Sequence, residues 1–409
     1  MDPSDGRGRG GRMRTVRVSV STAARPGPGA RDGADLSGGW RPHTWIGAPA
    51  PGGLALPPAH PTMAWLYAPR GVYLDDRYLV VADSGNHRVL VWHGVPDRDG
   101  TPADVVLGQP DGESEGPAAG GRGPEHGLHL PTGVLVHDGR LVVADAWHHR
   151  VLVWDRVPED SGRPPDLVLG QPDPSAAEPN RGGECSATTM YWPYGVAVVG
   201  GRFYVADTGN RRVLGWSGGI PDSPDRPADL VLGQPGPQAR EENRGEGAGP
   251  RSFRWPHDIA GTDTTLLVAD AGDHRVLGWR PHPQADRDAD LVLGQPDFHS
   301  TAEFPYGPQR PDRLRFPYAI STGPDGDGLR LAVADTANNR ILLWHDLRPG
   351  TAGPADAVLG QPTFAEGGEN RWAAVAPDTL CWPYGICLHG DLLAVADSGN
   401  NRVMIWRRG

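Results

Sequence analysis

Five side chains able to do chemistry stand directly after a proline that recurs along the chain. They are one guanidinium, one imidazole and three phenols, at Arg70, His257, Tyr194, Tyr318 and Tyr384. Three indoles stand directly before the same kind of proline, at Trp192, Trp255 and Trp382. Aromatic walls with a few polar anchors are typical of small-molecule sites, so these eight residues are our candidate ligand-binding residues. The alternative is that the rings only fill an internal space, because aromatic side chains usually pack.

Four histidines form a second candidate site. They lie at His126, His129, His148 and His149. Imidazoles are common ligands of transition metals, and Cys185 further along the chain could add a thiolate. No nearby carboxylate is expected to orient the imidazoles, and exposed histidines often bind nothing. We therefore predict no required cofactor, with a transition metal at these histidines as the alternative.

A unit that the chain repeats six times must position both sets of residues. Its repeated aspartate returns every 62 to 65 residues, at Asp83, Asp145, Asp207, Asp270, Asp335 and Asp397. Each copy contains four short runs rich in Val and Leu, which in the first copy cover residues 71–74, 78–82, 89–92 and 104–108. Such runs, bounded by Gly, Pro or Asp, predict strands buried on both faces. Six units of four antiparallel strands predict an all-β fold, a six-bladed β-propeller.

The last copy ends at Trp406, after three strands, and lacks its fourth. Residues 44–49 resemble the missing strand, and Ala48 lies 21 residues before Pro69. We expect this N-terminal strand to complete the last blade and close the ring, which removes exposed sheet edges. The predicted domains are a disordered Gly/Arg-rich extension over residues 1–39 and the propeller over residues 40–409, with Met1 or Met13 as the start.

An arginine follows each repeated aspartate five residues later, and we interpret the two as a structural ion pair that braces a tight turn. A feature present six times cannot mark one site. These turns emerge at the same end of the propeller as the long connectors between blades. Each connector runs 22 residues from the glutamine of a Gly-Gln-Pro sequence to the proline that opens the next blade. This connector-rich face is the expected binding face.

The pattern Ala-Asp-x-x-Asn-x-Arg-Val, with His87 and His274 before the arginine, resembles the NHL repeat. The Leu-Gly-Gln-Pro endings are similar to those of a bacterial branch of NHL propellers. The resemblance implies a binding platform or one of several enzymes, among them calcium-dependent lactonases and a zinc-dependent amidating lyase. Trp255-Pro256-His257 is similar to the zinc-binding context of that lyase, but the equivalent positions of the other blades hold Arg, Thr or Tyr. The resemblance also suits an accessory protein of a metalloenzyme system such as a hydrogenase.

The net charge is −11, and residues 1–31 carry seven Arg against two Asp, so the remainder is more acidic still. An acidic body argues against nucleic acid as a partner, since phosphate contacts require a basic face. No apolar run is long enough for a membrane span, and three cysteines are too few for a disulfide framework. We therefore expect a cytoplasmic protein that does not associate with membranes.

These observations predict a non-catalytic binding or scaffolding propeller that engages a protein partner or a small ligand through its connector-rich face. The alternative is a propeller enzyme, a metal-assisted lyase or hydrolase, with its site at the mouth of the central channel. Catalysis would need a base and an orienting partner at this mouth. The enzyme would use Arg70, His257 and a tyrosine, and a charged substrate would suit it because Arg70 lies opposite His257 in the ring.

Overall fold

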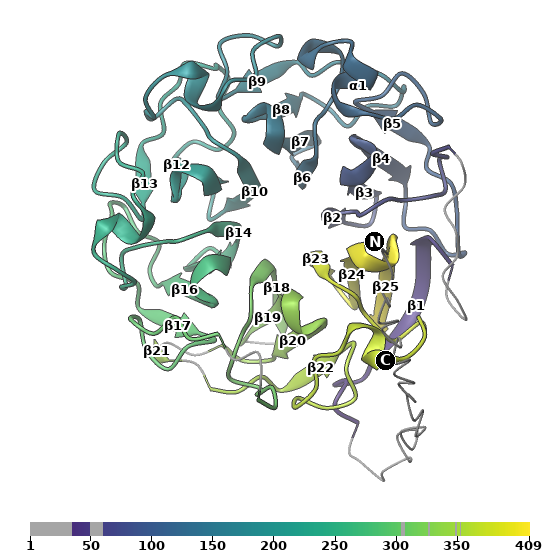
Figure 1. The fold of residues 1–409 in the computed structure, drawn as a ribbon, viewed down its shortest axis with the longest axis vertical. Coiled ribbons are helices and arrows are strands. Elements are labelled where there is room, and N and C mark those ends of the chain that lie inside the picture. Colours follow the sequence, from purple (N-terminus) through teal and green to yellow (C-terminus); the bar gives the residue numbers. More distant parts are fainter. Residues whose placement is uncertain (1–34, 50–59, 304–306, 326–327, 348–349, 352) are drawn as a thin grey trace, which may run out of the picture. The chain divides into compact units, whose positions relative to one another are not determined.

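The computed structural model describes residues 35–49, 60–303, 307–325, 328–347, 350–351 and 353–409. Residues 35–409 form one compact unit. The predicted Gly/Arg-rich extension lies outside the described residues, except for its last five positions. Within this unit, six antiparallel sheets follow one another around a ring, as predicted (Figure 1).

Each sheet is one blade of four strands ordered from the centre outward. The strands of blades 1 and 2 are β2 (Gly71–Leu74), β3 (Tyr78–Asp83), β4 (Arg88–His93), β5 (Val105–Leu107), β6 (Pro131–His137), β7 (Arg140–Asp145), β8 (Arg150–Trp154) and β9 (Leu167–Leu169). Those of blades 3 and 4 are β10 (Pro193–Val199), β11 (Arg202–Asp207), β12 (Arg212–Trp216), β13 (Leu230–Leu232), β14 (Pro256–Thr262), β15 (Thr265–Asp270), β16 (Arg275–Trp279) and β17 (Leu291–Leu293). Those of blades 5 and 6 are β18 (Pro317–Asp325), β19 (Gly328–Asp335), β20 (Arg340–Trp344), β22 (Ala357–Leu359), β23 (Pro383–His389), β24 (Leu392–Asp397), β25 (Arg402–Arg408) and β1 (Trp40–Gly47).

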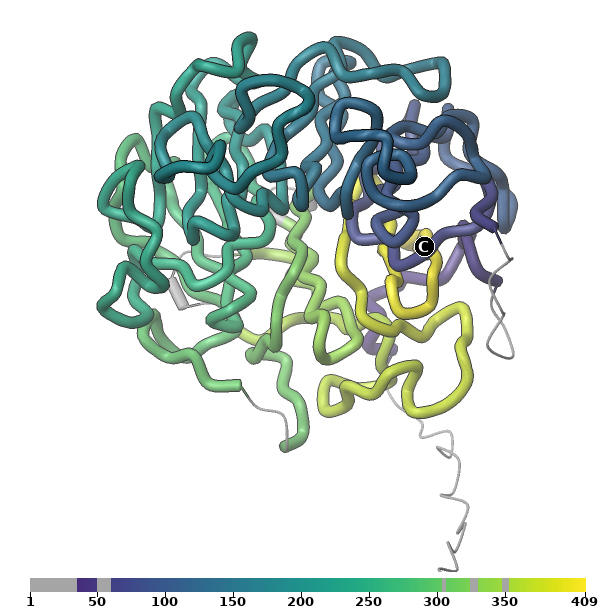
Figure 2. Tube along the Cα trace, turned by 45° about the horizontal axis from the view of Figure 1, so that its top comes forward, coloured from purple at the N-terminus to yellow at the C-terminus, as the bar shows by residue number. Residues whose placement is uncertain are grey.

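The ring closes through β1, which pairs antiparallel with β25 as the outer strand of blade 6. The pairing aligns Thr44 with Ile405 and Gly47 with Arg402. In both views the purple strand lies beside the yellow C-terminal blade (Figures 1 and 2). The prediction that an N-terminal strand completes the last blade is therefore confirmed, and β25 is not left as a sheet edge.

The hydrophobic core consists of six clusters, and each lies between two neighbouring blades. The cluster between blades 6 and 1, for example, joins Ile46 and Val403 to Leu79 and Leu90. A single repeat would leave both of its apolar faces in water, so each blade depends on its neighbours for stability.

The repeated aspartate and arginine form a buried ion pair in every blade, with Nε–Oδ2 distances between 2.7 and 3.1 Å. The arginine also binds the connectors. Arg212 Nη2 donates to the carbonyls of Ser186 and Thr189 in the preceding connector, and Nη1 donates to the carbonyl of Pro237 in the following one. Each such arginine therefore ties connector backbone to the blade turn, and the turns and connectors do share one end of the propeller.

One feature differs from the predicted pattern of four strands. A short strand, β21 (Gly350–Thr351), lies parallel to β17 and adds a fifth strand to the outside of blade 4. The remaining elements are single turns that precede the third strand of each blade or lie in the connectors. They comprise α1 (Pro117–Gly121) and the 3-10 turns at Ser84–Asn86, Pro124–His126, Ala146–His148, Pro179–Gly182, Thr208–Asn210, Glu242–Gly245, Ala271–Asp273, Thr336–Asn338, Glu369–Trp372 and Ser398–Asn400. No helix of the described chain is long and apolar enough to cross a membrane.

Candidate functional site at the channel mouth

The innermost strands of the six blades surround a central cavity of about 300 Å³. Five of these strands begin at the recurring proline, and the residue after it starts the inner wall. All five polar candidates from the sequence line this cavity: Arg70, Tyr194, His257, Tyr318 and Tyr384. The repeat thus brings together residues that are up to 314 positions apart in the chain.

The candidates form a continuous arc of ring contacts across blades 3, 4, 5, 6 and 1. The His257 ring lies 4.4 Å from that of Tyr194 and is stacked at 4.4 Å and 7° on Tyr318. Tyr318 lies 4.8 Å from Tyr384, and Arg70 Cζ lies 5.1 Å from the Tyr384 ring centre. Ring packing of this kind is what the filling alternative predicts. The arc nevertheless carries polar groups into the cavity wall.

His257 is held as a neutral imidazole. Burial lowers its pKa to about 4, and the nearby Arg70 charge lowers it further, against the raising effect of a hydrogen bond to the Trp255 backbone. Since a carbonyl can only accept, the 2.9 Å contact with Trp255 O places the proton on Nδ1. At neutral pH, His257 therefore offers the cavity a hydrogen-bond acceptor, Nε2, and no positive charge.

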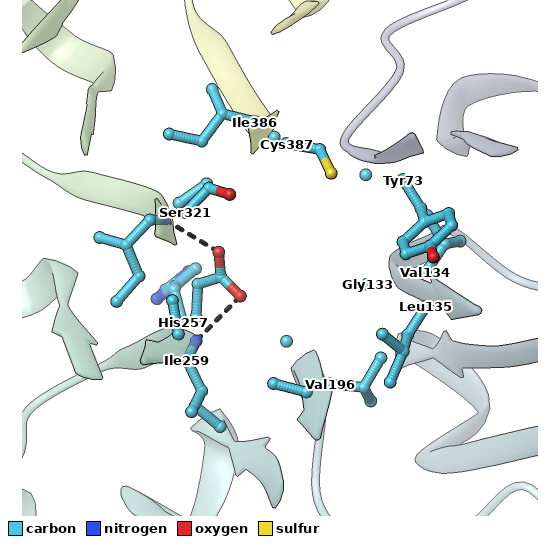
Figure 3. A pocket seen from close by; sticks show the side chains of 18 of the residues that line it. Tyr73, Gly133, Val134, Leu135, Val196, His257, Ile259, Ser321, Ile386 and Cys387 are labelled. Atoms are coloured by element: carbon cyan, nitrogen blue, oxygen red, sulfur yellow. Dashed lines mark hydrogen bonds between the residues drawn. The ribbon is translucent and has the colours of Figure 1, made fainter. Parts of the chain in front are cut away.

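Asp258 supplies the only carboxyl group among the described residues that line the cavity. Four other inner strands have a glycine at this position: Gly71, Gly133, Gly195 and Gly385. A Cβ at Gly195 would stand 2.5 Å from the His257 carbonyl oxygen, so close strand packing explains the glycines. In blade 4 the carboxyl group instead accepts hydrogen bonds from Ile259 N and Ile320 N, both at 2.9 Å (Figure 3).

Burial raises the pKa of Asp258 to about 7, against the lowering effect of its two backbone hydrogen bonds. A carboxyl group with a raised pKa holds its proton more tightly in the folded state than in the unfolded state. Its contribution to stability is therefore lost as the pH rises from about 4 towards 7. From pH 4 to pH 8, we expect the wild type to lose about 2 kcal/mol of unfolding free energy relative to the Asp258→Asn variant. The figure is reduced from the full shift because Asp258 lines the cavity and is partly exposed.

Urea titrations of both proteins across this pH range would measure that difference. Comparing the two proteins at each pH removes the constant effect of replacing one carboxylate oxygen by an amide group. A free-energy difference that stays constant from pH 4 to pH 8 would show that Asp258 titrates normally.

The three candidate indoles lie outside the cavity wall. The backbone N–H groups of Trp192 and Trp382 donate to the preceding blade, at His149 Nδ1 (3.1 Å) and Asn339 Oδ1 (2.8 Å). Both residues have positive φ, near 50°, as this contact requires. The Trp255 ring stacks against Phe316 at 6.3 Å instead. The residue before the proline therefore connects neighbouring blades, whereas the residue after it faces the channel.

Of the four candidate metal ligands, His129 and His148 are in ring contact, and His149 and His126 each have another partner. His148 takes the place of the asparagine of other blades, and its Nδ1 lies 2.8 Å from Asp145 Oδ2. His149 accepts the Trp192 N–H through Nδ1, and burial lowers its pKa to about 4. His129 lies 5.5 Å from the His148 ring, while His126 lies 3.7 Å from Glu125 on another part of the connector.

Cys185 is also engaged elsewhere, since its thiol donates to the Gln238 carbonyl at 3.0 Å. In the part of the chain that the structure describes, no three His, Cys, Asp or Glu side chains are grouped to hold a metal ion. A transition metal at these histidines stays a prediction from the sequence. His148, which stands at the asparagine position, and His149, which accepts the Trp192 N–H, each have a structural explanation.

Sequence reasoning missed most of a rim of exposed aromatic residues on the connector-rich face, of which only Trp382 was a candidate from the sequence. The large apolar side chains most exposed among the described residues are Tyr67, Trp147, Tyr191, Trp372 and Trp382. Tyr67 and Tyr191 lie two residues before the recurring proline, Trp147 lies in a blade turn, and the others lie in the last connector. We call these five residues the aromatic rim. A comparison of the position two residues before the proline across the six copies could have revealed Tyr67 and Tyr191.

Comparison with known proteins adds no family. No protein-family model matches the chain, and no curated protein matches it. The WD40 β-propeller domain of Doa1 shows 11% sequence identity and a TM-score of 0.46, with 91% of this chain and 98% of that chain covered. The computationally designed Ika8 protein shows 9% identity and a TM-score of 0.37, with 85% and 98% covered. The six-bladed propeller assigned here follows from the strand pairing within the chain itself.

Proposed function

We propose that this protein is a non-catalytic binding propeller that engages a protein partner through its connector-rich face. The proposal rests mainly on the observation that every member of the aromatic rim lies on this face. Trp372 is 77% exposed, Tyr67 52% and Trp147 48%, although tryptophan and tyrosine are normally well buried. Exposed aromatic side chains of this kind supply most of the binding energy at many protein interfaces.

The rim residues lie on turns and connectors that are joined by hydrogen bonds. This favours tight binding, because little conformational entropy is lost on association. In blade 1, Gln109 Nε2 donates to the carbonyls of Asn86 and Gly116, so the turn is tied to the connector. Trp147 also packs edge-on to Trp192 at 6.5 Å. Trp382 is held by a 2.9 Å hydrogen bond from Nε1 to Glu369.

The charge of the face indicates the chemistry of the partner. The five connectors together hold eleven Glu and five Asp against ten Arg, a net charge of −6. Their glutamates are Glu113, Glu115, Glu125, Glu178, Glu184, Glu241, Glu242, Glu246, Glu303, Glu366 and Glu369. A partner with apolar side chains surrounded by Lys or Arg would match this surface. The same charge disfavours nucleic acid, whose phosphates would be repelled.

The proposal includes two finer assignments. We assign the blades to the NHL type because the Asp, Asn and Arg of the repeat form one hydrogen-bonded unit. In blade 1, Asp83 Oδ2 accepts from Asn86 Nδ2 at 2.9 Å and from Arg88 Nε at 2.7 Å.

We also propose a cytoplasmic location, which is compatible with three free thiols.

Loss of two rim residues should abolish partner binding. We expect the double variant Trp147→Ser/Trp372→Ser to bind at least tenfold more weakly than the wild type, because each buried interface tryptophan contributes about 2 kcal/mol or more. Affinity capture from cells that express each tagged protein, with quantification of the main co-purifying protein, would measure the loss.

The matched control is Tyr78→Ser, which removes a half-buried aromatic ring at the opposite end of blade 1. This variant should retain the partner, and capture should weaken with added salt if the partner surface is basic. Equal retention by the rim variant, or equal loss by the control, would contradict the proposal.

A further inference from the structure

Arg70 brings a positive charge to the channel mouth, and no Asp or Glu of the described residues forms an ion pair with it. Its guanidinium is half-buried, and its only side-chain contact given by the structure of the described residues is with the Tyr384 ring, at 5.1 Å. A half-buried charge without a counter-ion is unfavourable, because burial removes its hydration. The geometry therefore favours an anion from outside the protein at this position.

Three phenol groups, those of Tyr194, Tyr318 and Tyr384, line the same cavity as Arg70. The pKa values of Tyr194, Tyr318 and Tyr384 are raised, first by burial, and in each case the Arg70 charge acts in the opposite direction. Each of the three phenols therefore experiences the Arg70 charge, and all three stay protonated and able to donate a hydrogen bond. The Tyr194 hydroxyl is buried and has no hydrogen-bond partner among the described residues. A buried polar atom without a protein partner calls for a ligand or a water.

Asp258 gives the cavity a negative pole. Each of its carboxylate oxygens accepts one backbone N–H, which leaves further acceptor capacity on both. No described cation forms an ion pair with it. Both charges act on the Tyr194 phenol. Burial has the largest effect and raises its pKa, the Arg70 charge lowers that pKa, and the Asp258 charge raises it. Arg70 and Asp258 line opposite sides of the cavity, because they belong to blades 1 and 4 of the ring of six (Figure 1).

We propose that the channel binds a small zwitterion, with its carboxylate held by Arg70 and the tyrosine hydroxyls and its ammonium group held by Asp258. The cavity of about 300 Å³ is at the small end of ligand pockets, which suits a molecule of this kind. The inner strands between the two charges, whose lining residues include Val134, Val196 and Ile386, would cover the carbon chain of the ligand. This site is separate from the aromatic rim, so either proposal can fail without the other.

Titration calorimetry at pH 8 with γ-aminobutyrate, butyrate and butylamine tests the assignment. We expect γ-aminobutyrate to bind with a Kd on the order of 1 mM or below. It should bind about tenfold more tightly than butyrate or butylamine, because only the zwitterion uses both poles. Arg70→Leu should weaken γ-aminobutyrate about tenfold to a hundredfold, and Asp258→Asn should reduce its affinity to that of butyrate.

Two further variants separate binding from folding. Tyr194→Phe removes only an unpaired hydroxyl, so it should weaken binding several-fold with no loss of thermal stability. Arg77→Leu removes an exposed guanidinium that lies 5.1 Å from the Tyr78 ring, the same geometry as Arg70 over Tyr384, and should leave binding unchanged. Absence of γ-aminobutyrate binding at about ten times the expected Kd, or equal binding by Arg70→Leu and Arg77→Leu, would overturn the proposal. Equal affinity for butyrate and γ-aminobutyrate would overturn the role of Asp258.

Discussion

Replacement of Ile46 by aspartate should open the propeller ring. Ile46 lies in β1, is fully buried and packs in the cluster between blades 6 and 1. The change removes an apolar side chain from a packed core and places an unpaired carboxylate there, so we expect a loss of about 5 kcal/mol in unfolding free energy. Separation of β1 would also expose the outer edge of β25, which should promote association between molecules.

Urea unfolding and size-exclusion chromatography would measure both effects. His43→Asp is the matched control, since His43 is exposed in the same strand at the register shift between Pro42 and Thr44. It should unfold like the wild type and stay monodisperse. If Ile46→Asp were no less stable than His43→Asp, β1 would not be the closing strand.

The second large effect is expected at the buried ion pair of blade 3. Arg212 lies 2.8 Å from Asp207 and donates to three connector carbonyls. Arg212→Met would leave Asp207 buried without its cation and the carbonyls without donors. We expect a loss of about 4 kcal/mol, because removal of one partner from a buried pair leaves an uncompensated charge. Thermal and urea unfolding would measure it.

Arg140→Met provides the comparison, because Arg140 pairs with Asp155 at 3.1 Å near the surface. Exposed ion pairs contribute roughly 0 to 1 kcal/mol, so this variant should be nearly as stable as the wild type. Similar losses in the two variants would refute the bracing role assigned to the repeated pair.

The repeat explains why the fold could be predicted closely. The first predicted run, residues 71–74, coincides with β2, and the predicted closing segment overlaps β1. Each blade repeats the same strand signals, so six copies remove ambiguities that a single short apolar run would leave. The added strand β21 could not be predicted, because it lies on a segment that differs from the other copies and has only two residues.

The candidate site was predictable only where backbone geometry follows from the repeat. A residue directly after the blade-opening proline starts the inner strand, and this places Arg70 and His257 in the channel wall. The indoles before that proline lie outside the cavity wall. The backbone N–H groups of Trp192 and Trp382 bind the preceding blade, in each case a residue 43 positions away. Such long-range hydrogen bonds leave no local signal in the sequence.

Site-specific photocrosslinking in the native host would test the central claim most directly. A benzoylphenylalanine probe would replace Trp147 or Trp372 on the aromatic rim, and Tyr78 at the opposite end as the control. We predict that both rim positions yield a covalent adduct with the same protein and that position 78 yields none. Adducts from position 78 alone, or no adduct from either rim position, would contradict a binding function for the connector-rich face.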